Sequence, residues 1–199
     1  MKQIVYILKN IEELSPLQNG VFSNGDLKNI IQPNNTAFYY RIVSQLIESG
    51  IIERFSREYY ITKDVNLSAL SQNICSDSYI SFGTVLAKNL IIGSVPEYRI
   101  RAVKKGPTRV YKNSKYTIEH FKITENLWTG YKTENGINIA FPEKAFVDTL
   151  YYYQKGIKFN FDIYSDIYYE ELDEIKIKKY LDLYKSKKFV TFVNGVING

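Results

Sequence analysis

The 199-residue sequence has very few of the residues on which many functional sites depend. It contains one cysteine, Cys75, and one histidine, His120. A single cysteine cannot build a disulfide framework, which is typical of proteins of the reducing cytoplasm. One histidine without a cysteine partner also falls short of the usual ligand set of a zinc site. We therefore predict a cytoplasmic protein without a metal or cofactor.

Long apolar runs are missing as well. No stretch reaches the roughly 18 apolar residues of a membrane-spanning helix, so we expect no membrane partner. The apolar stretch near the N-terminus is soon interrupted by Lys9, Glu12 and Glu13, and it is too short for a signal peptide. What the sequence has in excess is aromatic residues, with 18 tyrosines and 11 phenylalanines, which predicts an aromatic core.

Catalytic motifs are not evident. Glu119 and Lys122 flank His120 in a predicted strand, as in some metal-dependent nucleases, but they would point to opposite faces and no paired carboxylates accompany them. The segment 106–109 lacks the glycine spacing and the lysine of a phosphate-binding loop. We predict that the chain is not an enzyme and that His120 is a satisfied strand residue.

The first 65 residues have the pattern of a winged helix-turn-helix. Helical periodicity covers residues 2–14, and Ser23 with Asp26 forms a capping-box pattern for a second helix to about residue 31. Asn34 or Asn35 can cap a third helix, which ends near Gly50. Two short strands around a tight turn at 56–58 follow. We predict a winged helix-turn-helix at residues 1–65 and a polar linker at residues 66–77.

The third helix would read DNA. In this fold, side chains near the N-terminal half of the recognition helix reach base edges in the major groove, and the wing contacts the backbone or the minor groove. The alternative is a winged helix that contacts only protein. The predicted DNA contacts are Asn35, Thr36, Phe38, Tyr40, Arg41 and Ser44 in the helix, and Arg54 and Arg57 in the wing.

Positive charge is concentrated in the middle of the chain. Residues 1–65 hold seven cations and seven anions, whereas residues 66–160 hold thirteen and seven. A basic stripe at residues 97–115 has seven cations and one anion, which suits a polyanion, although a solvated charged surface has the same composition. We predict that this stripe adds to DNA binding through Arg99, Arg101, Lys104, Lys105 and Arg109.

Residues 78–199 predict a second, mixed α/β domain with a small antiparallel sheet. A short helix is expected at 81–90, and alternating runs indicate strands at 98–103, 108–111, 116–122 and 137–141. Pro142 at a first helical position opens a helix to about residue 153, and a further helix is expected near 173–184. Lys144 and Asp148 are i,i+4 neighbours that can pair. The fold class is therefore α+β.

The order of these motifs resembles the AbiEi family of antitoxins, from abortive-infection (phage-defence) type IV toxin–antitoxin systems. The resemblance covers about residues 5–155. Its more specific part is the string Ala140–Asp148, which follows Ser78-Tyr79-Ile80-Ser81; the less specific parts are Leu46–Arg54, at the end of the predicted recognition helix, and Gly106–Arg109.

The resemblance implies a transcriptional regulator that binds inverted repeats in its own promoter as double-stranded DNA and represses it. It also implies an antitoxin domain that opposes a nucleotidyltransferase-like toxin without forming a stable complex. The antitoxin motif would be Pro142, Glu143, Lys144 and Asp148, with either a structural or an antitoxic role.

Two other functions stay open at this point, a protein that binds its toxin directly and a ligand-sensing transcription factor. The last would need a sizeable apolar pocket within residues 78–160. We expect a monomer in solution, because cooperative binding to two repeats needs no stable dimer.

Overall fold

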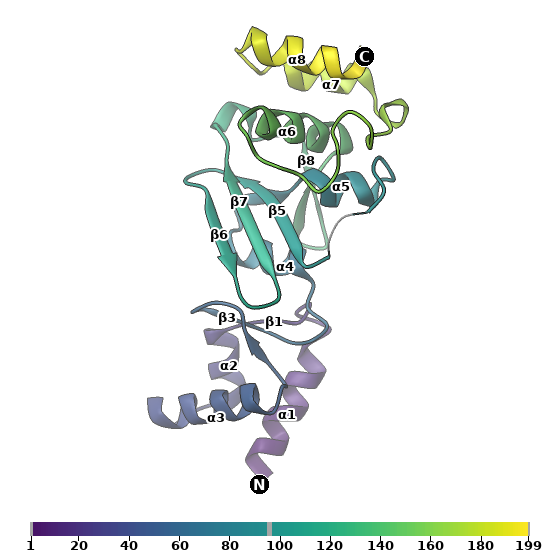
Figure 1. Ribbon diagram of the computed structural model, residues 1–199. Coiled ribbons are helices and arrows are strands. Elements are labelled where there is room, and N and C mark those ends of the chain that lie inside the picture. The colour runs from purple at the N-terminus through teal and green to yellow at the C-terminus, as the bar shows by residue number, and fades with distance from the viewer. Residues whose placement is uncertain (1, 95–96, 199) are drawn as a thin grey trace. The chain divides into compact units, whose positions relative to one another are not determined.

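The computed structural model describes residues 2–94 and 97–198 and has the predicted α+β class (Figure 1). The chain divides into two compact units. Unit 1 comprises Met1–Leu70 and Tyr111–Thr117, and unit 2 comprises Ser71–Val110 and Ile118–Gly199. None of the helices in the described ranges is both long enough and apolar enough to cross a membrane.

Unit 1 consists of three helices and a small sheet. Its elements are α1 (Lys2–Leu14), β1 (Val21–Ser23), α2 (Asn24–Ile31), α3 (Thr36–Glu48), β2 (Glu53–Arg54) and β3 (Tyr59–Ile61). The three strands lie in the order β1-β3-β2, and both pairings are antiparallel. The helices pack around one apolar core, which includes Ile7, Phe22, Leu27, Tyr39 and Leu46.

Local signals explain where these helices start and end. Ser23 and Asp26 form the capping box predicted for α2, and Asn35 caps α3 by accepting a hydrogen bond from the Phe38 amide at 2.8 Å. Gly50 has a φ of +71°, the left-handed conformation that glycine adopts at low cost after a helix. The predicted helices of residues 1–50 are thus confirmed, and β1 is an additional strand.

The segment at 66–77, expected to be a linker, instead contains helix α4 (Leu67–Ile74). The Asn66 carboxamide oxygen caps it by accepting from the amides of Ser68 and Ala69. Leu67 and Leu70 are buried. The polar composition of this segment concealed the helical spacing of Leu67, Leu70 and Ile74.

Unit 2 is built on a six-stranded sheet of order β6-β7-β5-β4-β9-β8. Its strands are β4 (Ser78–Ile80), β5 (Arg99–Lys104), β6 (Arg109–Lys112), β7 (Thr117–Lys122), β8 (Tyr131–Glu134) and β9 (Ile137–Ala140). The turn of the β6–β7 hairpin, Tyr111–Thr117, groups with unit 1, so β6 ends and β7 begins within that segment.

The sheet is mixed, which corrects the expected small antiparallel sheet. β4 pairs antiparallel with β5 but parallel with β9, where Ile80 lies opposite Ile139. Parallel neighbours need a long crossover, and here the chain from β4 to β9 includes α5 and four further strands. No local pattern in the sequence reports such a long-range pairing.

Helix α6 (Pro142–Gln154) is the central helix of unit 2. It packs against α5 (Phe82–Lys88), α7 (Glu174–Leu181) and α8 (Lys187–Asn198). Two short 3-10 helices, Glu125–Leu127 and Tyr169–Glu171, complete the unit. Because other elements cover α6, every residue from Glu143 to Leu150 is buried.

Candidate functional site

The outward face of α3 carries several of the residues predicted to contact DNA. Tyr39, Ile42, Val43 and Leu46 are buried in the core of unit 1, which fixes the rotation of the helix. The opposite face exposes Thr36, Arg41 and Ser44, and Tyr40 retains 61% of its exposure. The side chains near the N-terminal half of α3 are therefore accessible to a partner.

Two of the residues predicted to contact DNA, Asn35 and Phe38, also have structural roles in unit 1. The Asn35 oxygen is occupied as the cap of α3, and its amide nitrogen donates to the Asn34 oxygen at 3.2 Å. Phe38 is half-buried, and the Arg41 guanidinium lies over its ring, 5.1 Å from the centroid. This contact holds Arg41 against the helix surface while its donors stay exposed.

The hairpin between β2 and β3 carries the two arginines predicted for the wing. Both Arg54 and Arg57 are exposed. Arg54 donates from Nε to the Ser56 carbonyl at 3.1 Å, and the Arg57 carbonyl accepts from the Asn24 side chain at 3.0 Å. Asn24 also accepts from the Tyr39 hydroxyl at 3.0 Å, so hydrogen bonds connect the hairpin with both α2 and α3.

The basic stripe is less available than its composition indicates. Arg101 donates to Glu119 at 2.7 Å, and Arg99 lies 3.9 Å from the same carboxylate. Lys104 is only 8% exposed, so it is poorly placed for a phosphate contact. Lys105 pairs with Glu125 at 3.1 Å and lies over the ring of Trp128. Arg109 on β6 is exposed.

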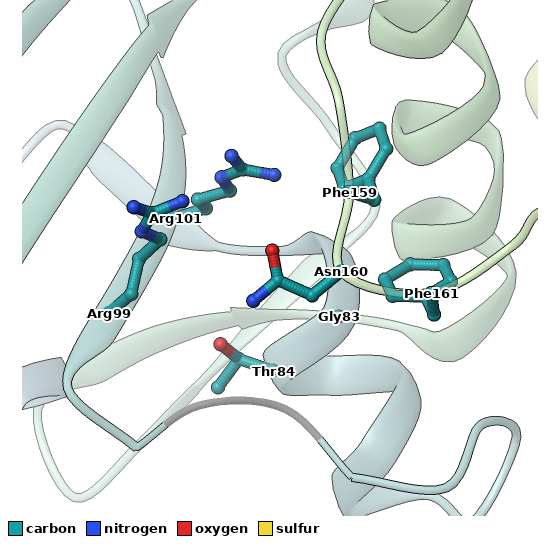
Figure 2. A pocket seen from close by; sticks show the side chains of 7 residues that line it. All are labelled: Gly83, Thr84, Arg99, Arg101, Phe159, Asn160 and Phe161. Atoms are coloured by element: carbon teal, nitrogen blue, oxygen red, sulfur yellow. The ribbon is translucent and has the colours of Figure 1, made fainter.

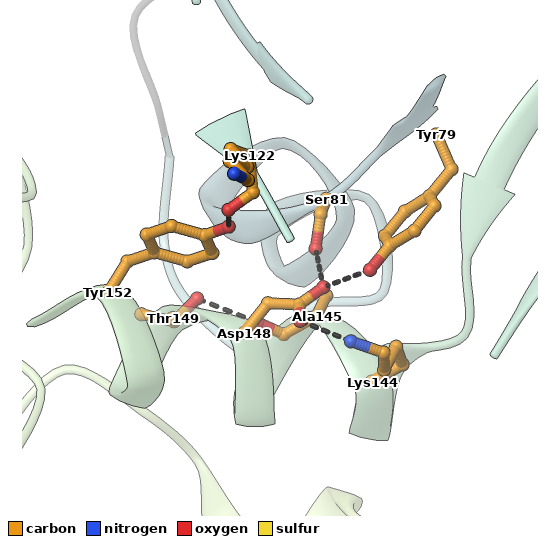
Figure 3. A network of polar contacts seen from close by, with 8 residues as sticks. All are labelled: Tyr79, Ser81, Lys122, Lys144, Ala145, Asp148, Thr149 and Tyr152. Carbon is orange, nitrogen blue, oxygen red and sulfur yellow. Dashed lines mark hydrogen bonds and ion pairs between the residues drawn. The ribbon is translucent and has the colours of Figure 1, made fainter. Parts of the chain in front are cut away.

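The conspicuous motif at the start of α6 is buried. Lys144 and Asp148 retain 1% and 0% of their exposure and form the predicted i,i+4 ion pair (Figure 3). The hydroxyls of Tyr79 and Ser81 donate to the other carboxylate oxygen at 3.0 and 2.9 Å. Burial, followed by the nearby Asp148 charge, raises the pKa of Tyr79 well above its usual value and keeps it protonated as a donor.

The other two residues of the predicted antitoxin motif, Pro142 and Glu143, lie at the start of α6 next to Lys144. Pro142 is the first residue of α6, and Glu143, 5% exposed, pairs with Lys176 of α7 at 3.3 Å. The motif thus connects β4, α6 and α7 inside unit 2. No local pattern in the sequence indicates that Tyr79 and Ser81 complete the network, because they precede Asp148 by 69 and 67 residues.

His120 is fully buried on β7 and shares a hydrogen bond of 2.8 Å with the Ser71 hydroxyl. Burial and, secondarily, the charge of Lys104 lower the pKa of His120 to about 4. The imidazole is therefore neutral at physiological pH. A side chain without solvent contact is placed to support the sheet, as the sequence predicted for this histidine.

A comparison of the chain with known family models finds no match. A comparison with curated proteins finds none either.

Proposed function

We propose that the protein is a cytoplasmic DNA-binding antitoxin that represses its own operon in a type IV toxin–antitoxin system of phage defence. The observation that carries the DNA-binding part is the outward face of α3, which exposes Tyr40, Arg41 and Ser44. The β2–β3 hairpin of the same unit exposes two further cations, Arg54 and Arg57. An exposed helix of this width fits the major groove of B-DNA.

The order of elements in unit 1 supports a winged helix-turn-helix. Three helices are followed by a two-stranded hairpin, and a short strand between α1 and α2 joins that hairpin in one sheet. In such a fold the third helix enters the major groove and the hairpin flanks it. Arg54 and Arg57 then serve as backbone contacts.

The antitoxin part of the proposal is assigned to unit 2. It rests on the order of motifs in the sequence, above all the Ala140–Asp148 string downstream of Ser78–Ser81. Because Lys144 and Asp148 are buried, the role we assign to them is to hold β4, α6 and α7 together rather than to touch a partner. The proposed target is a nucleotidyltransferase-like toxin, opposed without a stable complex by a monomeric, non-catalytic protein.

The test is binding of the full chain to duplex DNA from the region upstream of its operon, measured by fluorescence anisotropy beside a scrambled duplex of the same length. We expect Arg41→Ala to weaken binding to the upstream duplex by about 1–3 kcal/mol if Arg41 reads a base. Lys9→Ala is the matched control, because Lys9 is an exposed cation of unit 1 on α1.

Equal affinity for the upstream and scrambled duplexes would contradict the repressor role. Equal effects of Arg41→Ala and Lys9→Ala would show that α3 is not the reading element.

Direct binding of a toxin is the second candidate, and one observation favours it. Residues 1–65 have no net charge, whereas DNA-binding modules are usually basic. Co-purification of the full chain with its toxin as a stable complex, without any shift of the upstream duplex, would favour this alternative.

The ligand-sensing alternative needs a large apolar pocket. A cavity of unit 2 between β5, α5 and the segment after α6 instead encloses only about 30 Å³ and is lined by Arg99 and Arg101.

A further inference from the structure

Unit 2 has a concave site between β5, α5 and the segment that follows α6 (Figure 2). Arg99 and Arg101 extend from β5, Thr84 comes from α5, and Asn160 points into the same space. Phe159 and Phe161 form the wall on the side of α6. The cavity encloses about 30 Å³ and opens to solvent, which is enough for a few water-sized groups.

Arg101 is fixed in this site. Its Nε donates to Glu119 at 2.7 Å and its Nη1 to the Lys158 carbonyl at 2.9 Å. Its guanidinium lies over the ring of Phe159, 5.0 Å from the centroid. These contacts hold the guanidinium charge at one edge of the cavity. Because the Arg101 side chain is already ordered, binding of a ligand does not incur the entropic cost of ordering that side chain.

Arg99 has unused donor capacity. Its Nε is 3.9 Å from Glu119, too long for a hydrogen bond, and that buried atom has no hydrogen-bond partner within residues 2–94 and 97–198. Two guanidinium groups thus share one carboxylate, which leaves the site with an excess positive charge. A buried donor without an acceptor is costly, so an incoming oxyanion is favoured here.

We propose that this site binds the phosphate group of a small phosphorylated molecule. Guanidinium donors match the geometry of phosphate oxygens, and the Thr84 hydroxyl and the Asn160 amide supply neutral donors. The cavity holds one such group, so the rest of the ligand lies outside it, beside Phe161 at the rim. Site and ligand class are independent of DNA binding by α3.

Contact with a DNA backbone fits these arginines less well. The Arg101 side chain is only 13% exposed, and both arginines line a concavity. Side chains that contact the phosphates of a DNA duplex lie exposed on the protein surface, as Arg109 does. We therefore reassign Arg99 and Arg101 from the basic stripe to a small-molecule site.

The test is calorimetric titration of the full chain with inorganic phosphate and with adenosine monophosphate at low salt. The key variant is Arg99→Gln, and Arg109→Gln is its matched control because it removes an exposed arginine from the neighbouring hairpin of the same unit. We expect Arg99→Gln to weaken binding of both ligands about tenfold or more, and Arg109→Gln to change it less than about twofold. Thr84→Val, which keeps the side-chain shape, is expected to weaken binding several-fold.

Three results would overturn the proposal. One is no binding of either ligand at 10 mM, roughly the weakest affinity that an ordered site would show. Another is an equal loss in Arg99→Gln and Arg109→Gln, because that result indicates diffuse charge attraction. The third is a loss in Arg99→Gln confined to duplex DNA, which would return Arg99 to the DNA backbone. Circular dichroism of each variant checks that the fold is retained.

Discussion

His120 couples the stability of unit 2 to pH. Its pKa is about 4 in the folded protein and about 6.5 when unfolded, because burial disfavours the imidazolium and the Lys104 charge adds to the effect. Between these values the unfolded chain binds the additional proton, so the contribution to stability is complete above pH 6.5 and is lost as the pH falls towards 4.

The free energy of unfolding should therefore fall by about 2 kcal/mol between pH 7 and pH 5 from this residue alone. Urea unfolding followed by the fluorescence of Trp128, the only tryptophan, measures it. In His120→Gln, which can keep a hydrogen bond to Ser71, the pH dependence over this interval should be flatter. The same pH dependence in both proteins would show that His120 does not titrate as described.

Asp148 neutralises a buried ammonium group, and this makes its charge essential. In Asp148→Asn the hydroxyls of Tyr79 and Ser81 still have a polar partner, but Lys144 is left as an uncompensated charge. We expect a loss of about 3–5 kcal/mol in the free energy of unfolding, measured by urea titration.

Glu174→Gln is the matched control for Asp148→Asn, since Glu174 and Lys178 form another i,i+4 pair, 3.6 Å apart, with both side chains mostly exposed. It should change stability little. Equal losses in the two variants would contradict the buried network as a stabilising element.

At the scale of elements, two glycines test how tightly α6 and α7 are packed. Gly130 and Gly136 have φ values of +78° and +77°, so an alanine is strained at either position. A Cβ at Gly130 would lie 2.7 Å from the Tyr180 ring and 2.9 Å from Cγ of Lys144, whereas a Cβ at Gly136 meets nothing within 4 Å.

Gly130→Ala should therefore destabilise the protein by about 1–3 kcal/mol more than Gly136→Ala, because the backbone strain is common to both and only the first overpacks. Thermal unfolding followed by circular dichroism gives the comparison. If the two variants have the same stability, α7 can shift away from Gly130 at no cost.

Elements with strong local signals were predictable from the sequence. The Ser23–Asp26 capping box, the Asn35 cap and Pro142 at a first helical position each located a helix start to within a residue or two. β8 was missed because it lies at the edge of the sheet and its residues are polar and partly exposed. The parallel pairing of β4 with β9 depends on contacts between distant segments, which no local window contains.

For a similar reason, the exposed face of α3 could be predicted from the sequence, whereas the availability of the basic stripe could not. The exposed face of α3 follows from helical periodicity, so Thr36, Arg41 and Ser44 could be placed on it in advance. The basic stripe could not be judged in this way, because the carboxylates that neutralise it, Glu119 and Glu125, come from later segments. A count of charges in a segment omits the partners that folding brings to it.

For the whole molecule, the distribution of charge predicts how DNA binding depends on salt. The chain carries a net charge of +5, and residues 66–160 alone carry a net charge of +6. Of the stripe cations predicted to contact DNA, Lys105 and Arg109 are exposed, whereas Lys104 is buried. If unit 2 contributes to DNA binding, Lys105 and Arg109 are the predicted contacts that can reach backbone phosphates, and Lys105 must then exchange its ion pair with Glu125 for a phosphate.

The double variant Lys105→Ala, Arg109→Ala should then lower the slope of log affinity against log salt concentration by about 2, because each neutralised phosphate contributes roughly 0.9 to the slope. Anisotropy titrations of the upstream duplex at several salt concentrations measure it. Lys179→Ala, Lys188→Ala removes two exposed cations of unit 2 on α7 and α8 and serves as the control. A slope unchanged in the first variant would confine the DNA contacts to unit 1.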